Sequence, residues 1–341
     1  MALTLTRLPE RPPDWDTLIR RYPGKSLFHE SGWLDHIATI YPGSSLEYLS
    51  VHDGSRHVGY LSVHTMRRFF LKILGSPLPG TGTLEMGPLI EPSVDIGDVI
   101  VALSEYCKAT GVKHMELAGY DLEPERARAL GLQTSKWLTR LRPLPSNESD
   151  AWAAIRSTCR NRIRKALHNG LVAEWTDDPR IIDHFYEQYQ EVWAKQGLTI
   201  PFGIERVHSL WENLLPKGLL IPVWVKHGDQ IVATGLFPHD EKCVYFWGGA
   251  SWLRYHHLYP NELLHWTLMR LAIERGIPLY DMYGGKSQFK AKFGGEEVIA
   301  PRYSMSFLPL LKIARNQYRA YHRRRRKRWK QRRDAAVVAR A

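Results

Sequence analysis

The sequence lacks the features that place a chain in a membrane or outside the cell. It has no apolar run approaching the roughly 18–20 residues of a transmembrane helix, and its first residues, MALTLTR, become polar too early for a signal peptide. It has only three cysteines, Cys107, Cys159 and Cys243, which lie far apart. An odd and scattered set favours neither a disulfide framework nor a zinc cluster. We therefore expect a cytoplasmic protein without a bound metal.

Acidic residues are missing from one region of the chain. Residues 312–333 contain 12 of the 47 Lys and Arg residues and no Asp or Glu, while the other 35 basic residues balance 35 acidic ones. The net charge of +12 therefore belongs to this tail. Such a segment is typical of a solvated or disordered arm, and its field attracts polyanions, either RNA or the anionic face of a membrane. Trp329 within it suits base stacking and a lipid interface equally well.

Two parts of the sequence resemble each other. Residues 103–119, LSEYCKATGVKHMELAG, align without a gap with residues 268–284, LMRLAIERGIPLYDMYG. Each stretch predicts a helix, a glycine stop and a short strand. Upstream of each lies a predicted hairpin, YLSVHDGSRHVGYLSVH and IPVWVKHGDQIVATGLF. The repeat predicts a duplicated α/β architecture with mixed sheets.

The boundary between the halves is expected at PLPSNESD, where two prolines end the predicted strand 134–142. We divide the chain into an N-terminal module, residues 1–145, a C-terminal module, residues 146–311, and the basic tail, residues 312–341, which is helical or disordered. Ser149 or Asp150 is expected to cap the next helix, predicted over residues 151–169.

That helix carries a cluster of cations beside an apolar stripe. The stripe includes Cys159, which we expect to be buried. Few acidic residues lie nearby in the sequence, so the cations repel one another unless an anion or distant acids offset them. The cluster is either a solvated surface or a phosphate-binding face, because clustered guanidinium groups suit phosphate oxygens. Its members are Arg160, Arg162, Arg164 and Lys165.

The segment 284–296, GGKSQFKAKFGGE, concentrates lysines, phenylalanines and glycines. Phe289 and Phe293 are four residues apart, so one helical turn directs both rings toward the core. One interpretation is a helix–loop corner with solvated lysines. The other is a rigid loop that presents a lysine to a negatively charged donor or a developing oxyanion. Asp281, at the end of the preceding strand, then orients or deprotonates an amine, or serves only as a turn residue.

Four stretches together resemble the Fem-type acyltransferases, the two-module branch of the GNAT superfamily, and the related BioF2-like acetyltransferases. They are LFHESGWLDHI, CRNRIRKALHNGL, YPNELLHWTLMRLAIERGIPLYDMYGG and QFKAKFGGE, and they extend over about residues 27–300. The resemblance implies two fused GNAT-like modules with a cleft near their junction. It also implies transfer of an aminoacyl or acyl group, from aminoacyl-tRNA in Fem enzymes, to an amine of a peptidoglycan-type or other cell-wall precursor.

The resemblance also assigns residues. Phe289 and Lys290 match the Phe-Lys pair that meets the donor, and Lys292 and Asn261 are further donor-binding candidates, although Asn261 at a helix start also suits an N-cap. The cations Arg160, Arg162, Arg164 and Lys165 match residues near the precursor's phosphates. His29 and Trp33 are acceptor-site candidates. Catalysis is assigned to Lys290 and Asp281, and no metal or bound cofactor is expected.

Two departures from the family pattern leave the substrates open. Trp33 is followed by Leu-Asp-His-Ile, without the lysine that Fem enzymes place there, and no good match exists to the pyrophosphate-binding loop of coenzyme A-dependent GNAT enzymes. We therefore favour aminoacyl-tRNA as the donor, with acetyl-CoA and a polysaccharide or amino-sugar acceptor as the alternative. A non-catalytic RNA or membrane binder is a third possibility, and residues 312–333 allow a peripheral position at the inner membrane face.

Overall fold

The computed structural model of the chain describes residues 3–308, apart from residues 42, 69–70, 196 and 285–286. The predicted tail at residues 312–341 lies outside the described residues. The elements of the first half are β1 (Leu3–Arg7), α1 (Trp15–Ile19), η1 (Leu27–His29), α2 (Ser31–Ile40), β2 (Ser44–Asp53), β3 (Arg56–Arg68), β4 (Leu71–Ser76), β5 (Leu89–Ile90), α3 (Ile96–Ala109), β6 (His114–Ala118), α4 (Pro124–Ala129) and β7 (Gln133–Pro143).

The second half also mixes helices and strands. They are α5 (Glu148–Ala153), α6 (Ser157–His168), β8 (Leu171–Trp175), α7 (Arg180–Lys195), α8 (Glu205–Leu214), η2 (Leu215–Lys217), β9 (Leu220–His227), β10 (Gln230–Pro238), β11 (Val244–Tyr245), β12 (Gly248–Ser251), η3 (Leu253–Leu258), α9 (Pro260–Glu274), β13 (Leu279–Asp281), α10 (Gln288–Ala291) and β14 (Glu296–Ser306). None of the helices within the described residues is long and apolar enough to cross a membrane.

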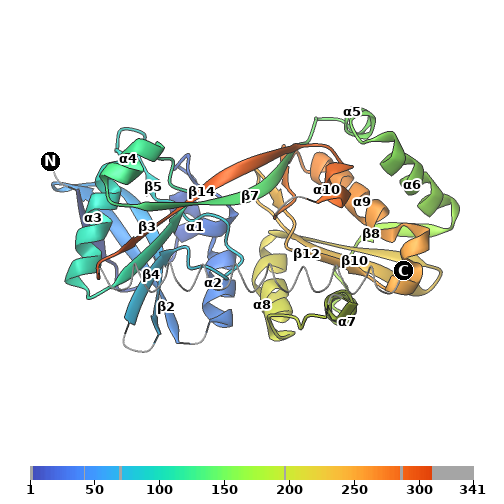
Figure 1. Ribbon diagram of the computed structural model, residues 1–341, viewed down its shortest axis with the longest axis horizontal. Helices are drawn as coiled ribbons and strands as arrows, with labels where there is room; N and C mark the ends of the chain where they lie inside the picture. Colours follow the sequence, from blue (N-terminus) through green and yellow to red (C-terminus); the bar gives the residue numbers. More distant parts are fainter. Residues whose placement is uncertain (1–2, 42, 69–70, 196, 285–286, 309–341) are drawn as a thin grey trace, which may run out of the picture.

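Two lobes lie side by side, and the long strands β7 and β14 run between them (Figure 1). The larger sheet has the order β1-β2-β3-β4-β6-β14-β7-β13-β11, with β5 paired to β3, so it continues from the first half into the second. The smaller sheet, β12-β10-β9-β8, belongs to the second half. Strand β14 lies between β6 and β7 and is antiparallel to both. The sheet of the first half is therefore completed by the last described strand of the chain.

The predicted repeat is confirmed in its local structure. The hairpins β2–β3 and β9–β10 occupy equivalent places in the two halves. Helix α3 ends before Gly111 and leads to β6, while α9 ends before Gly276 and leads to β13. Both glycines have positive φ, 74° and 69°, the left-handed conformation that terminates a helix at little steric cost. The α/β architecture with duplicated modules is thus present.

The helix predicted over residues 151–169 is wrong in its extent, because the chain forms two helices, α5 and α6. Arg156 is extended between them, with φ −58° and ψ 140°, and its amide donates to the carbonyl of Lys292 at 3.0 Å. The cap was also predicted wrongly: Asn147 caps α5 by accepting from the amide of Asp150. The apolar stripe is confirmed, since Cys159 is fully buried.

Three apolar clusters form the core. One lies in the first half around Val63 and Leu103, and one in the second half around Ile163 and Leu268. The third joins the halves by packing α1 and α2 against α7 and α8, and buries Trp33. The division at residues 145/146 stays a prediction, and it has to accommodate β14, which lies in the sheet of the first half.

Candidate functional site

A cavity of about 540 Å³ lies at the junction of the two halves. Its floor includes alternate residues of β7 and β14, which face the same side of the sheet. Residues of the first half close one side and residues of the second half the other. The lining includes His29, Glu85, Trp137, Thr139, Asp240, Tyr245, Asp281, Val298 and Ala300. Both halves are therefore needed to form this cavity.

Asp281 reaches the cavity from the end of β13. It is 6% exposed, and its Oδ1 accepts hydrogen bonds from the Thr139 hydroxyl and, at 2.7 Å, from the Tyr283 amide. Burial raises the pKa of Asp281, although these two bonds and the nearby Lys290 charge oppose the rise. A carboxylate with a raised pKa that faces a cavity is suited to accept a proton from a bound substrate.

Two further carboxyl groups line the cavity. Burial raises the pKa of Glu85, and the charges of Asp281 and Asp240 raise it further. Asp240 is 3% exposed and accepts from the amides of Lys242 and Cys243 through Oδ1. Its Oδ2 is buried without a partner among the described residues. Lys25 and Lys242 also line the cavity, but their ammonium groups are bound to Glu30, Glu241 and backbone carbonyls. The carboxyl groups therefore make this side suited to a positively charged group such as an amine.

Lys290, the predicted catalytic lysine, belongs to α10 and lies near Asp281, the last residue of β13. Its ammonium donates to the carbonyl of Met282 at 2.5 Å and to that of Tyr283, and it lies 4.7 Å from the centre of the Phe246 ring. Burial lowers the pKa of Lys290 to about 8, and the negative charge of Asp281 opposes this shift. Two of its three N–H donors are used to hold the turn, which leaves one for an incoming group.

The predicted pair Phe289 and Phe293 packs inward, as the spacing indicated. The ring centroids are 5.5 Å apart, and both rings contact the buried His265. Burial lowers the pKa of His265 to about 3, so the ring is neutral at physiological pH. Its Nδ1 lies 2.8 Å from the Tyr280 hydroxyl. These aromatic contacts fix α10 and hence the position of Lys290.

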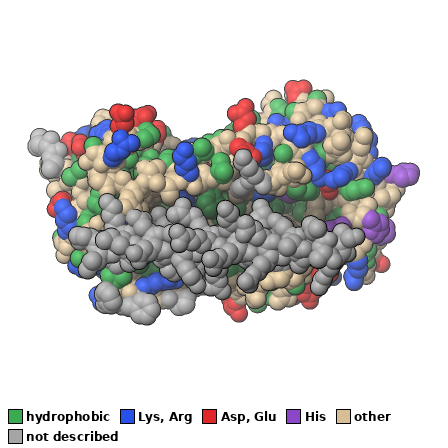
Figure 2. All heavy atoms as spheres, in the orientation of Figure 1, with side chains coloured by type: hydrophobic (Ala, Val, Ile, Leu, Met, Phe, Trp, Pro, Cys, Tyr) green, Lys and Arg blue, Asp and Glu red, His purple; other side chains and the backbone are tan. Residues whose placement is uncertain are grey.

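The basic helix α6 is adjacent to this region but does not line the cavity. Arg162 pairs with Glu262 at 3.0 Å, Arg164 lies over Trp152, and Arg160 donates to the carbonyl of Ala153. Arg164 and Lys165 are exposed, and basic side chains gather over the α5–α6 end of the molecule (Figure 2). Their predicted contact with acceptor phosphates remains a prediction.

Lys292 and Asn261, the other predicted donor contacts, are held by neighbouring side chains. Lys292 pairs with Glu262 at 2.8 Å, next to Arg162. Asn261 is not the N-cap of α9, because Tyr259 occupies that position and Pro260 begins the helix. The Asn261 amide instead donates to the Ser251 hydroxyl at 2.8 Å. A role for either residue toward a donor stays a prediction.

Of the two predicted acceptor residues, only His29 borders the cavity. The His29 Nδ1 accepts from the Ser26 amide at 3.2 Å, so its Nε2–H donates to the carbonyl of Gly87 at 2.9 Å. Burial lowers the pKa of His29 to about 4. Trp33 is 1% exposed and donates to the Thr83 hydroxyl, which makes it part of the core between the halves.

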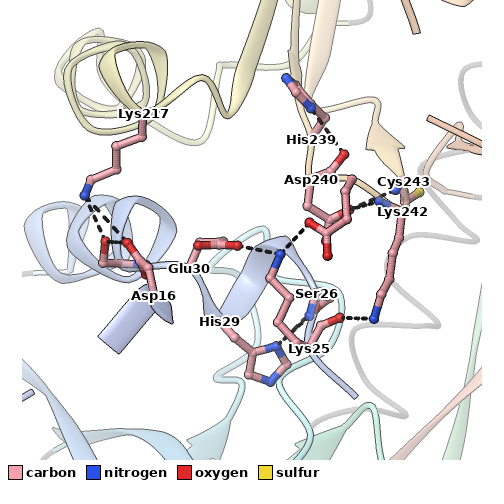
Figure 3. A network of polar contacts seen from close by, with 12 residues as sticks. Asp16, Lys25, Ser26, His29, Glu30, Lys217, His239, Asp240, Lys242 and Cys243 are labelled. Atoms are coloured by element: carbon pink, nitrogen blue, oxygen red, sulfur yellow. Dashed lines mark hydrogen bonds and ion pairs between the residues drawn. The ribbon is translucent and has the colours of Figure 1, made fainter. Parts of the chain in front are cut away.

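A network of ion pairs beside the cavity fastens the two halves together (Figure 3). Lys25 pairs with Glu30 at 2.5 Å and with Glu241 of the other half at 2.6 Å. Lys242 donates to the carbonyls of Pro23 and Lys25, each at 2.9 Å. Each lysine thus bridges the two halves, which fixes His29 and Asp240 on the walls of the cavity.

Within the described residues, no group of three or more His, Cys, Asp or Glu side chains is placed to hold a metal ion.

Sequence reasoning missed several residues of this region, above all Glu85, Thr139 and Asp240. Glu85 lies in an irregular segment, and Thr139 is one of many alternating residues of a strand. The DxxC turn at Asp240 is a local signal, since its carboxylate accepts two backbone amides, but such turns occur throughout proteins. Only the pairing of distant segments reveals their proximity.

Residues 153–291 match a family model described as an acetyltransferase (GNAT) domain. No curated protein matches the chain. Several solved structures share its fold over most of its length. FemX has a TM-score of 0.71 at 14% identity, covering 90% of this chain and 99% of that one. A tandem GNAT protein from the clavulanic acid biosynthesis pathway has a TM-score of 0.55 at 12% identity, with coverage of 90% and 99%. L-PGS from Bacillus licheniformis has a TM-score of 0.54 at 12% identity, with coverage of 89% and 96%.

Proposed function

We propose that this tandem GNAT-fold acyltransferase of the Fem type transfers an aminoacyl or acyl group to an amine of a cell-envelope precursor. The observation that carries the proposal is the position of Asp281, a buried carboxylate of raised pKa in a cavity that both modules line. Acidic neighbours on one wall favour the binding of a cationic amine. The envelope acceptor is supported by the resemblance to Fem-type enzymes and by the folds of FemX and L-PGS.

The chemistry needs few groups. Asp281 accepts a proton from the bound ammonium, and the amine nitrogen then attacks the carbonyl carbon of the activated donor. A carbon–nitrogen bond forms, the tetrahedral intermediate collapses, and the bond to the leaving oxygen or sulfur breaks as that atom takes up a proton. We assign the remaining N–H of Lys290, which lies next to the cavity and is not part of its lining, to the oxyanion of this intermediate. No metal or bound cofactor is required by these steps.

Aminoacyl-tRNA is the favoured donor because of the environment at the start of α9. This helix begins at Pro260, which has no amide hydrogen, and the buried Glu262 lies in its first turn. Glu262 already neutralises Arg162 and Lys292 and interacts favourably with the helix dipole. A coenzyme A pyrophosphate bound by the backbone amides at this helix start therefore lacks the donor at Pro260 and meets a first turn that Glu262 already occupies. Acetyl-CoA with an amino-sugar or polysaccharide acceptor is the alternative, which the family description of an acetyltransferase domain favours.

Calorimetric titration of the full chain with charged tRNA, deacylated tRNA and acetyl-CoA separates these donors. We expect saturable binding of charged tRNA, tighter than that of deacylated tRNA at both low and high salt, and weakened in Lys290→Ala. Arg270→Gln is the control, because Arg270 lies on the outer surface and pairs with Glu148. Binding of acetyl-CoA, with equal and salt-sensitive binding of both tRNA forms, overturns the tRNA assignment. Absence of acyl transfer from either donor overturns the enzymatic proposal.

A further inference from the structure

We propose that the α6–β8 corner of the second half is a docking surface for an anionic lipid bilayer. This corner is made by Arg164, Lys165, Leu167, His168 and Val172. Its apolar side chains enter the headgroup region of the bilayer, and its cations contact the lipid phosphates. The inference goes beyond the proposed function and does not depend on the transfer reaction, because it concerns where the protein is held.

The corner lies at the outer end of the second lobe (Figure 1). Helix α6 ends at His168, and the chain returns through Gly170 into β8, an edge strand of the smaller sheet. Gly170 has φ of 79°, and a Cβ atom at this position would meet nothing within 4 Å. The turn therefore faces open space and is accessible to a large, flat partner.

Two aliphatic side chains stand on either side of this turn. Leu167 is 53% exposed and Val172 is 55% exposed, the highest values among the large apolar side chains of the described residues. Their neighbours Ala166 and Leu171 are buried, so the core fixes both segments while Leu167 and Val172 reach solvent. One exposed aliphatic side chain is ordinary, and the significance of this pair comes from the cations around it.

The cations are Arg164 and Lys165, which are both exposed. Helix α6 contains no Asp or Glu, and neither cation has an ion-pair partner in the part of the chain that the structure describes. By contrast, Arg162 of the same helix pairs with the buried Glu262. Exposed aliphatic groups and unpaired cations thus share residues 164–172, a combination that complements anionic headgroups and the acyl-chain boundary beneath them.

Two acidic residues near the corner leave its positive charge in place. Glu174 of β8 pairs with Lys226 at 2.7 Å and accepts from the Trp224 indole at 3.0 Å. Asp229 lies in the neighbouring β9–β10 turn, close to His227. Figure 2 shows Lys, Arg and His side chains gathered at this end of the molecule. The corner therefore attracts an anionic surface.

RNA is the other polyanion that these cations attract, but the side chains beside them suit lipid better. Bases stack on exposed aromatic faces, and the aliphatic Leu167 offers none. The Trp152 ring is already contacted by Arg164, at 5.4 Å, and by Trp266, at 4.8 Å. Trp175, which is 40% exposed, stands at the opposite end of β8. The composition of the corner therefore favours a bilayer.

A fluorescent probe at the corner tests the docking surface. The three cysteines of the chain are buried, so a thiol introduced as Leu167→Cys can be labelled selectively with an environment-sensitive fluorophore. Val101→Cys is the matched control, because Val101 is 47% exposed on α3 of the first half. We would add each labelled full chain to vesicles of equimolar phosphatidylglycerol and phosphatidylcholine, and to vesicles of phosphatidylcholine alone. We expect a blue shift only at position 167 and only with the anionic vesicles.

Sedimentation with the same vesicles measures what each group contributes. Arg164→Gln/Lys165→Gln is expected to weaken binding about tenfold or more, since each cation near an anionic surface contributes roughly fivefold. Arg67→Gln/Arg68→Gln removes the same net charge from exposed positions of β3 and should change binding less than about threefold. Leu167→Ser should weaken binding about three- to tenfold, also at high salt, because salt does not screen apolar insertion.

The basic residues 312–333 are present in every variant and are themselves expected to attract anionic vesicles. If they alone are responsible, all variants bind equally and the probe at position 167 shows no shift, which overturns the docking surface. A response of this probe to deacylated tRNA that exceeds its response to anionic vesicles also overturns it, in favour of RNA. No substrate is present in these measurements, so an absence of acyl transfer overturns the proposed function and leaves the docking surface standing.

Discussion

Asp281 and Lys290 hold the same residue from opposite sides: the carboxylate accepts from the amide of Tyr283, and the ammonium donates to its carbonyl. The two charges thus share one turn in place of a direct ion pair. Each side chain is then oriented by the backbone between them, which keeps the carboxylate on the cavity side and the ammonium against Phe246.

Replacing Asp281 with Asn tests its predicted role as the proton acceptor. The Asn side chain retains an oxygen for Thr139 and Tyr283, so the turn is expected to persist, while proton transfer is lost. We expect the rate of acyl transfer in single-turnover experiments to fall about 10²–10⁴-fold, with little change in donor affinity. A fall below threefold contradicts the role. Circular dichroism of the variant checks that the fold is intact.

The rate of acyl transfer is expected to depend on the charge of Lys290. With a pKa of about 8, Lys290 is protonated below that pH and loses its charge above it. Activity should therefore decline through about pH 8 on the alkaline side. In Lys290→Arg the side chain stays charged, and the decline should move to higher pH. If the decline of the rate at alkaline pH is unchanged in Lys290→Arg, a group other than Lys290 controls this decline.

Glu262→Gln is expected to destabilise the second half. The carboxylate is 7% exposed and balances two cations, of which Arg162 is 43% exposed and therefore partly screened. We expect a loss of about 1–3 kcal/mol in the free energy of unfolding, measured in urea. Glu148→Gln removes a pair that is largely exposed and should cost at most about 0.5 kcal/mol. If acetyl-CoA is the donor, Glu262→Gln should also strengthen its binding.

Stability should fall as the pH is lowered from about 6.5 to 4. The pKa values of His29 and His265 are lowered by burial to about 4 and about 3. In this range these two imidazoles take up protons in the unfolded chain but not in the folded one, so their contribution to the free energy of unfolding decreases as the pH decreases. The decrease should be smaller in His29→Gln, whose amide can still donate to Gly87, than in the exposed-site control His256→Gln. The free energy of unfolding is measured by urea titration at several pH values. If it falls equally with decreasing pH in the two variants, this assignment is refuted.

Local patterns in the sequence were sufficient to predict the hairpins, the helix–glycine–strand repeats and strand β7, because these depend on neighbouring residues. The break between α5 and α6 was not predictable in this way. It depends on the bond from the amide of Arg156 to Lys292, more than 130 residues away. The position of β14 also depends on long-range pairing, and its sequence alone indicates only a strand.

The candidate site shows the same limit. Asp281 and Lys290 stand out because they flank a glycine-rich turn, and the structure places them together. Arg206 lies in an amphipathic helix among other charged residues, and Arg302 alternates with apolar residues in a strand. Nothing local distinguishes either arginine from a solvated one. Their burial, and the absence of an acidic partner among the described residues, are apparent only in the folded chain.

The place of β14 in the sheet has a consequence for synthesis of the chain. When β6 and β7 leave the ribosome, the strand that joins them is still more than 150 residues from being made. The nascent first half must therefore keep two unsatisfied strand edges apart while the whole second half is translated. We expect folding intermediates of this chain to expose the β6 and β7 edges and to be candidates for chaperone binding until Ser306 has emerged.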